Sequence, residues 1–155
     1  MPKFRIRKRY IDGLVNWLQE LRLAGDESRT RTWFATLLKK ELDTLEDARI
    51  ALLSEYADKD SDGNPKIAID KSGKKVYDVP KEKLKELNDN YNKILEIFFT
   101  FEPSRDIGKM LVKAEKLVCE SPYLFGPREG MSKEERTRQI GLEEDYFVWC
   151  KAFGI

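Results

Sequence analysis

Residues 38–56 read LKKELDTLEDARIALLSEY, and this stretch decides the fold class of the chain. Its large side chains recur alternately every four and every three residues, which places them on one face of an α-helix. Good helix-forming residues extend the pattern on both sides, so the sequence predicts a helix near 28–57. The residues on this face are Leu38, Leu42, Leu45, Arg49, Leu52 and Tyr56.

A second stretch, residues 84–101, has the complementary pattern. Its apolar residues recur every three and every four positions after Pro80, which predicts a helix near 80–101. Two such helices in one chain can bury their apolar faces by packing against each other, so we expect a long antiparallel helical hairpin. Its buried side chains are expected to be Leu38, Leu42, Leu45, Leu52, Leu84, Leu87, Ile94 and Phe98.

The segment between these helices, residues 58–79, begins with a run of aspartate, glycine, asparagine and proline that is typical of turns. It continues as two short β-prone runs separated by Ser72 and Gly73. This pattern predicts a small β-hairpin near 66–79 at the tip of the helical hairpin.

The flanking sequences predict shorter elements. Phe4 and Ile6 alternate with basic residues, as in a strand, before a helix near 11–24. Beyond Pro103, apolar periodicity predicts helices near 104–120 and 132–153. The predicted fold class is therefore mainly α, in a single domain over residues 1–155. It comprises a basic strand and first helix in 1–24, the helical hairpin with its insert 58–79 in 25–101, and C-terminal helices in 104–155.

The composition argues against several classes of function. The chain has 155 residues, of which 29 are basic and 28 acidic, so no global field attracts it to nucleic acid or to a membrane. It contains no histidine, which excludes Ser-His-Asp and Cys-His catalytic systems, and its two cysteines cannot complete a tetrahedral zinc site. No apolar run is long enough to cross a membrane, and no signal-peptide pattern begins the chain. We expect a cytoplasmic protein.

One acidic motif resembles a metal-binding loop. Asp58, Asp60 and Asp62, followed by Gly63, occupy the first, third, fifth and sixth positions of an EF-hand calcium loop. The last position of that loop should hold a bidentate glutamate, but here it is Ile69. A solvated turn is the preferred interpretation, and calcium binding through the three aspartates is the alternative.

The first ten residues carry five cations and no acid. Such a segment can contact phosphates, but it is also typical of a strand edge whose charges discourage aggregation. We do not favour nucleic-acid binding, and residues that would carry it are Lys3, Arg5, Arg7, Lys8 and Arg9.

An aromatic run lies in the irregular stretch 121–130, between the last two predicted helices. Tyr123, Leu124 and Phe125 stand there among prolines and glycines, where large apolar side chains are poorly placed for burial in a core. We therefore expect these three residues to bind a protein partner.

Three stretches resemble a known group of proteins: ESRTRTWFATLL at 27–38, LLSEYADKDSDGNP at 52–65 and LNDNYN at 87–92. They are similar to small uncharacterised helical proteins that are encoded by bacteriophages and prophages of Gram-positive bacteria. The resemblance covers roughly residues 25–100. It implies a long helix, an acidic turn, a β-hairpin and a returning helix, and it brings no established activity or catalytic residues.

Together these observations favour a non-catalytic phage-type protein that acts by protein–protein interaction in the host cytoplasm. Its expected role is that of a virion assembly factor or an inhibitor of a host defence system. We assign no catalytic residue and expect no cofactor; the identity of the partner and self-association stay open. The rival hypothesis is a carboxylate- or metal-dependent hydrolase or nuclease that uses the acids near the β-hairpin.

Overall fold

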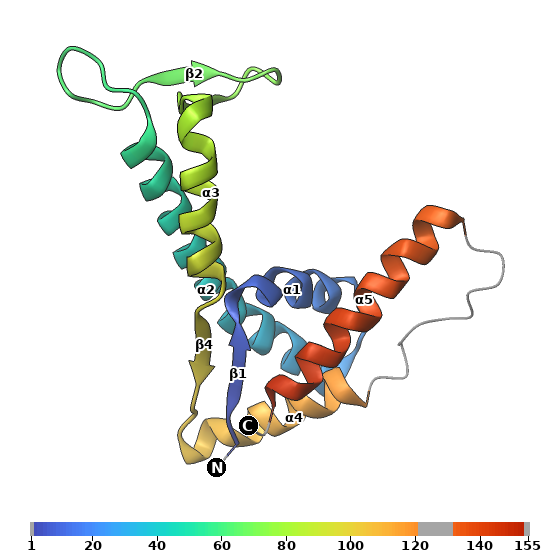
Figure 1. Cartoon of the computed structure of the whole chain (residues 1–155). Coiled ribbons are helices and arrows are strands. Elements are labelled where there is room, and N and C mark those ends of the chain that lie inside the picture. Colours follow the sequence, from blue (N-terminus) through green and yellow to red (C-terminus); the bar gives the residue numbers. More distant parts are fainter. Residues whose placement is uncertain (1, 121–131, 154–155) are drawn as a thin grey trace. The chain divides into compact units, whose positions relative to one another are not determined.

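The computed structural model describes residues 2–120 and 132–153, except for the side chains of 136–142. The chain is mainly helical, as predicted, with two small antiparallel sheets of two strands each (Figure 1). In chain order the elements are β1 (Phe4–Arg7), the 3-10 helix η1 (Lys8–Tyr10), α1 (Ile11–Glu20), α2 (Gly25–Tyr56), β2 (Ile67–Ile69), β3 (Lys75–Tyr77), α3 (Lys81–Leu95), β4 (Phe98–Phe101), α4 (Arg105–Cys119) and α5 (Lys133–Ala152).

The residues group into two compact units. Unit 1 comprises Met1–Leu42 with Phe98–Ile155, and unit 2 comprises Asp43–Ile97. The helix α2 contributes residues to both units. In the described part, no helix combines the length and the apolar character that crossing a membrane requires.

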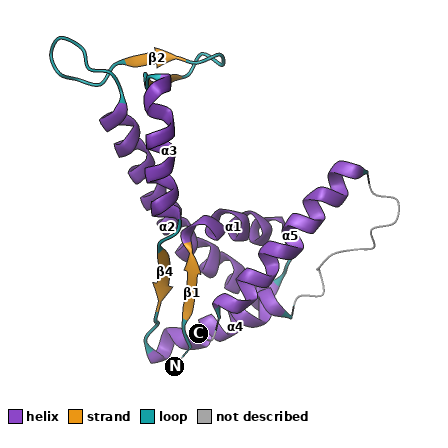
Figure 2. Cartoon of the chain, viewed as in Figure 1, coloured by secondary structure: helices purple, strands orange, loops and turns teal. Residues whose placement is uncertain are grey.

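The sheet of unit 1 joins two segments that are far apart in the sequence. β1 and β4 run antiparallel (Figure 2). Their register places Phe4 opposite Phe101 and Arg7 opposite Phe98. Because side chains alternate along a strand, Phe4 and Ile6 point to one face, where both are buried. The other face carries Arg5 and Arg7 from β1, with Phe98 and Thr100 from β4.

The core of unit 1 is built around Phe4. Its ring centroid lies 5.3 Å from that of Phe34 on α2 and 4.9 Å from that of Phe153, which pairs with Phe4 in an isolated β-bridge just after α5. Apolar residues of α1, α4 and the C-terminal part of α5 close the core. Their fully buried side chains include Ile11, Leu14 and Leu18 from α1, Leu111 and Val118 from α4, and Trp149 from α5.

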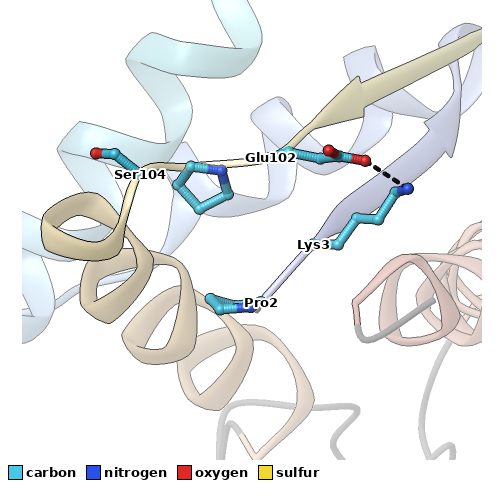
Figure 3. Close-up of a pocket in the computed structure, with 5 residues that line it drawn as sticks. Pro2, Lys3, Glu102 and Ser104 are labelled. Atoms are coloured by element: carbon cyan, nitrogen blue, oxygen red, sulfur yellow. Dashed lines mark ion pairs between the residues drawn. The ribbon is translucent and has the colours of Figure 1, made fainter.

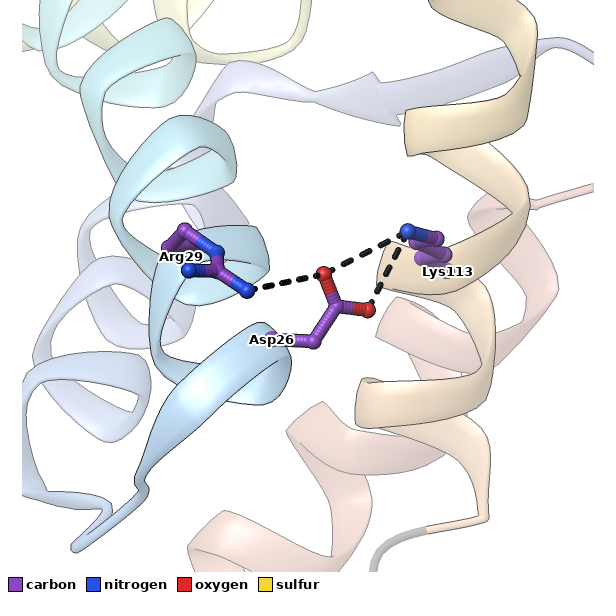
Figure 4. Close-up of polar contacts among 3 residues, drawn as sticks. All are labelled: Asp26, Arg29 and Lys113. Carbon is purple, nitrogen blue, oxygen red and sulfur yellow. Dashed lines mark hydrogen bonds and ion pairs between the residues drawn. The ribbon is translucent and has the colours of Figure 1, made fainter.

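An ion pair on the surface of unit 1 links the start of α2 to α4. The Lys113 ammonium lies 3.1 Å from the Asp26 carboxylate, and the Arg29 guanidinium lies 3.8 Å from the same carboxylate (Figure 4). All three side chains are largely exposed, so the pairs contribute little to stability. Packing of the apolar faces therefore holds these helices together.

Unit 2 has a much thinner interior. β2 and β3 form the β-hairpin predicted near 66–79, with Ile67 opposite Tyr77. The amide of Asn90 on α3 donates a hydrogen bond of 2.5 Å to the hydroxyl of Tyr56 on α2. Of the apolar side chains in this unit, all of which the structure describes, the buried ones are Leu45, Ala57 and Leu87.

The predicted helix 80–101 is wrong at its end. α3 ends at Leu95, and residues Phe98–Phe101 form a strand instead. The sequence Phe-Phe-Thr-Phe has high β-propensity, and β1 offers it a hydrogen-bonding partner that the local periodicity cannot reveal.

The predicted set of buried side chains on the two helices is also wrong in part. Leu38 is buried in the core of unit 1 and Leu42 packs against that core, whereas Leu45 and Leu87 are buried in unit 2. Leu52 and Ile94 are half-buried. Leu84 is 40% exposed and Phe98 is 42% exposed, because the first lies on the open side of α3 and the second on the outer face of the β1–β4 sheet.

The remaining predicted helices are confirmed, with small differences at their ends. α1 is one turn shorter than the predicted 11–24, and α2 begins slightly earlier than predicted. α4 and α5 match the predictions near 104–120 and 132–153. At the start of α5, Ser132 and Glu135 form a reciprocal capping box, in which each side chain accepts a hydrogen bond from the other residue's backbone N–H.

Candidate functional site

The outer face of the β1–β4 sheet brings two cations onto an aromatic ring. The Arg5 guanidinium carbon lies 4.1 Å from the ring centroid of Phe98, and that of Arg7 lies 5.4 Å from the same centroid. Such cation–π contacts are worth about 0.5–1 kcal/mol at exposed sites, enough to favour one side-chain direction. Since a guanidinium over a ring uses its face, the in-plane N–H donors of Arg5 can still bind a carboxylate or phosphate.

A similar arrangement lies on α5, whose last turns pack beside β1. The ammonium of Lys151 lies 4.3 Å from the ring centroid of Phe147, which is 61% exposed. The two residues are four positions apart and therefore share one face of the helix. Val148 and Ala152 occupy the neighbouring face, where Ala152 is buried.

Between these elements lies an open cavity of about 290 Å³, which we call the Arg5 groove. Among the residues that the structure describes, its lining includes three cations, which are Arg5, Arg7 and Lys151, and no carboxylate. Apolar and aromatic side chains complete it. The described residues that line it are Arg5, Ile6, Arg7, Tyr10, Phe98, Val148, Lys151 and Ala152.

The other cations of the N-terminal segment are placed differently. The ammonium of Lys3 lies 2.5 Å from the carboxylate of Glu102, and this hydrogen bond, together with the charge of Lys3, lowers the pKa of Glu102 (Figure 3). Lys8 forms a half-buried ion pair of 2.7 Å with Glu41. Arg9 is exposed on η1 and does not line the groove. The five cations of residues 1–10 therefore do not share one site. Arg5 and Arg7 line the groove, whereas Lys3 and Lys8 are in ion pairs elsewhere.

Two further cavities in unit 1 each contain a carboxylate. One of about 400 Å³ is lined by Lys3 and Glu102 with Pro2, Pro103 and Ser104 (Figure 3). The other, of about 390 Å³, is lined by Trp17, Glu20, Leu21 and Arg22. In both, an acid offsets the cation, so the Arg5 groove is the most cationic of these three cavities.

The acidic motif of unit 2 folds as a tight turn at residues 60–64, the Asp60 turn. One carboxylate oxygen of Asp60 accepts hydrogen bonds from the backbone N–H groups of Asp62 and Asn64, at 2.9 and 3.0 Å. Gly63 has a φ of 79°, a left-handed conformation that glycine adopts without steric cost. The carboxylate of Asp60 therefore stabilises its own turn.

A second turn at residues 70–74, the Asp70 turn, repeats this geometry. One carboxylate oxygen of Asp70 accepts hydrogen bonds from the N–H groups of Ser72 and Lys74, both at 2.9 Å, and Gly73 has a φ of 83°. This turn has a serine where the first has Asp62, yet it folds in the same way. Turn chemistry thus explains the spacing of Asp60 and Gly63 without a cation.

The other acidic candidates do not converge. Asp58 and Asp62 are exposed. In the part of the chain that the structure describes, no three histidine, cysteine, aspartate or glutamate side chains are grouped so that they could hold a metal ion. The structure therefore offers no assembled site at Asp58, Asp60 and Asp62.

The cysteines lie together at the junction of α4 and α5. Burial, and then a hydrogen bond with the Cys150 thiol, raise the pKa of the Cys119 thiol. The hydroxyl of Tyr146 donates a hydrogen bond of 2.8 Å to the carbonyl of Cys119. Because thiolates rather than thiols are nucleophiles, Cys119 is poorly suited to covalent chemistry at neutral pH.

The predicted partner-binding residues Tyr123, Leu124 and Phe125 lie outside the described residues. Sequence reasoning found Arg5 and Arg7 but missed Phe98, Phe147 and Lys151. The spacing of Phe147 and Lys151 on a predicted helix was a usable signal. The proximity of Phe98 to Arg5 depends on strand pairing between distant segments, for which the local sequence has no signal.

Comparison with protein-family models, with curated proteins and with solved structures finds no match for this chain.

Proposed function

We propose that this chain is a non-catalytic binding protein that holds an anionic macromolecular partner in the Arg5 groove. The observation that carries the proposal is the lining of the groove, whose described residues include three cations and no carboxylate. Two of these cations lie over Phe98 and the third lies over Phe147. These contacts favour one direction of the positive side chains before any partner arrives.

The electrostatics of the chain suit recognition at short range. The formal net charge is only +1, so attraction to a partner must come from the local arrangement of charges rather than from the whole molecule. Exposed charges of this kind affect the association rate and the choice of partner, and salt screens them. Binding should weaken as the ionic strength rises.

The rival function, a hydrolase or nuclease that uses carboxylates or a metal, has less support. It requires acids that converge in a concave site. Asp60 is engaged in its own turn, and Asp58 and Asp62 are exposed. Calcium binding by these three aspartates has the same weakness.

The biological setting is a proposal that rests on the sequence. Occlusion or scaffolding of a partner, in virion assembly or in the inhibition of host defence, is the kind of role that the phage-type resemblance implies. We also propose a cytoplasmic location and, for unit 2, a helical hairpin that carries a β-hairpin at its tip. Self-association through the same unit stays open.

Charge reversal tests the proposed site. Arg5→Glu combined with Lys151→Glu places an acid on β1 and another on α5, which makes the net charge of the described lining negative. Lys39→Glu combined with Lys109→Glu changes the net charge equally at exposed positions of unit 1 that do not line the groove. Each protein is titrated at low ionic strength against fluorescent poly-L-glutamate and against oligothymidylate, with binding followed by anisotropy.

We expect the unmodified protein and the control variant to bind at least one polyanion, and the groove variant to lose that binding. Circular dichroism and thermal melting establish that each variant is folded. Equal binding by the two variants would refute the proposal, as would the absence of binding to either polyanion by the unmodified protein.

A further inference from the structure

We propose that the occupant of the Arg5 groove is an acidic protein segment that carries one large apolar anchor residue. This inference rests on the proposed function and identifies the chemical class of the partner. It follows from the floor of the groove, from the positions of its cations and from the state of its aromatic rings.

The floor of the groove is apolar on its α5 side. It is formed there by Val148, which is half-buried, and Ala152, which is 2% exposed. The cavity volume of about 290 Å³ is at the lower limit for small-molecule pockets, which range from about 300 to 1,000 Å³. A cavity of this size suits a single side chain such as leucine or phenylalanine, whose burial would provide most of the affinity.

The cations come from two elements that line the groove together. Arg5 and Arg7 belong to β1, and Lys151 belongs to α5. A segment whose anchor residue enters the groove would therefore meet positive charge from more than one element. Arginine binds carboxylates through two parallel N–H donors, which favours aspartate or glutamate next to the anchor.

The same features fit single-stranded nucleic acid less well. Nucleic-acid grooves follow a regularly charged backbone with a series of cations, whereas Lys3 and Lys8, which could extend the series, are paired with Glu102 and Glu41. Bases bind by stacking on aromatic faces. Phe98 and Phe147 already have cations over their rings, so a base would have to displace them.

Three fluorescent probes of equal net charge test this inference. The first is a short peptide of aspartate and glutamate with a central phenylalanine, and the second has serine in place of the phenylalanine. The third is an oligothymidylate. We expect the phenylalanine peptide to bind about tenfold more tightly than the serine peptide, because only the first buries an apolar side chain.

Two variants locate the binding. Val148→Trp fills the groove without changing its charge, so it should reduce the affinity for the phenylalanine peptide to that for the serine peptide. Arg5→Glu with Lys151→Glu should weaken both peptides, whereas Lys39→Glu with Lys109→Glu should weaken neither beyond the general effect of charge. Because the Val148 variant leaves the cations intact, it decides the question even if the reversed variant fails to fold.

The results that would contradict this inference differ from those that would contradict the proposed function. Tighter binding of oligothymidylate than of the phenylalanine peptide overturns this inference and leaves the proposed function standing. Equal affinities for the two peptides also overturn it, because the anchor then has no role. If none of the three probes binds, both proposals fall.

Discussion

Units 1 and 2 bury their apolar residues to very different extents. In unit 1, side chains from β1, α1, α2, α4 and α5 meet in one cluster around Phe4 and Phe34. In unit 2, which is fully described, Leu45, Ala57 and Leu87 are buried, while Ile67 and Ile69 are 62% and 71% exposed. The comparison teaches that a sustained helical pattern does not by itself indicate how much surface a helix will bury. Unit 1 should determine the global stability, and unit 2 should open at a lower free energy.

Removal of a ring from the core of unit 1 should have the largest effect. Phe34→Ala deletes a fully buried side chain whose ring centroid lies 5.3 Å from Phe4 and 5.7 Å from Phe153. We expect the free energy of unfolding to fall by about 3–5 kcal/mol, measured by urea denaturation. Lys39→Ala, an exposed position on the same helix, is the control and should change stability little. Equal losses for the two variants would contradict a core at this place.

The corresponding change in unit 2 should cost less. Leu87→Ala removes one of its few buried apolar side chains, and we expect a cost of about 2 kcal/mol, at the lower end for such substitutions. Hydrogen exchange should show faster opening of amides within 43–97, with those of α1 and α4 unchanged. Leu84→Ala, on the exposed side of α3, is the matched control. Uniform acceleration throughout the chain would show that the two units unfold as one.

The two turns of unit 2 offer a smaller and internally matched test. Gly63→Ala and Gly73→Ala each place a Cβ at a positive φ, in open space, so strain and not a clash sets the cost. We expect each to destabilise its own turn by about 1–2 kcal/mol. Exchange rates of the Asn64 and Lys74 amides report the two turns separately. Lys71→Ala is the control, and a large difference between the two glycine variants would show that the turns are not equivalent.

The smallest of these effects should be the loss of stability of the Asp70 turn at acid pH. Hydrogen bonds from Ser72 and then from Lys74 lower the pKa of Asp70 in the folded chain. A lowered pKa stabilises the turn above the ordinary aspartate value of about 3.9, and this contribution is lost as pH falls through the folded pKa. NMR titration of the Asp70 carboxyl should show the lowered value, and Ser72→Ala should raise it. If the pKa of Asp70 is unchanged in Ser72→Ala, the Ser72 hydroxyl is not the cause of the lowered value.

The sequence predicted those features that depend on neighbours along the chain. The strand at Phe4 and Ile6 and the β-hairpin of β2 and β3 both have local signatures, and both are present. For the Arg5 groove, the sequence identified Arg5 and Arg7 as exposed cations, because alternation along a strand is also local.

The remaining features depend on contacts between distant residues. Large apolar and aromatic residues recur every three or four positions from Leu84 through Phe101. This spacing therefore does not reveal that α3 ends at Leu95. Phe98 is in a strand because β1 pairs with it, and that pairing also brings its ring to Arg5. No property of residues 84–101 alone distinguishes this outcome from a longer helix.

The pairing of Phe4 with Phe101 also determines the order in which the chain can fold as it is synthesised. Residues 4–7 leave the ribosome early, but their partner strand and Phe153 emerge much later. Until then, β1 lacks its hydrogen-bonding partner and Phe4 lacks the contact with Phe153, and incompletely packed nascent chains of this kind are prone to aggregation. Unit 2, which consists of residues 43–97 alone, has its complete sequence available sooner. During translation, unit 1, the more stable unit, therefore stays incomplete for longer than unit 2.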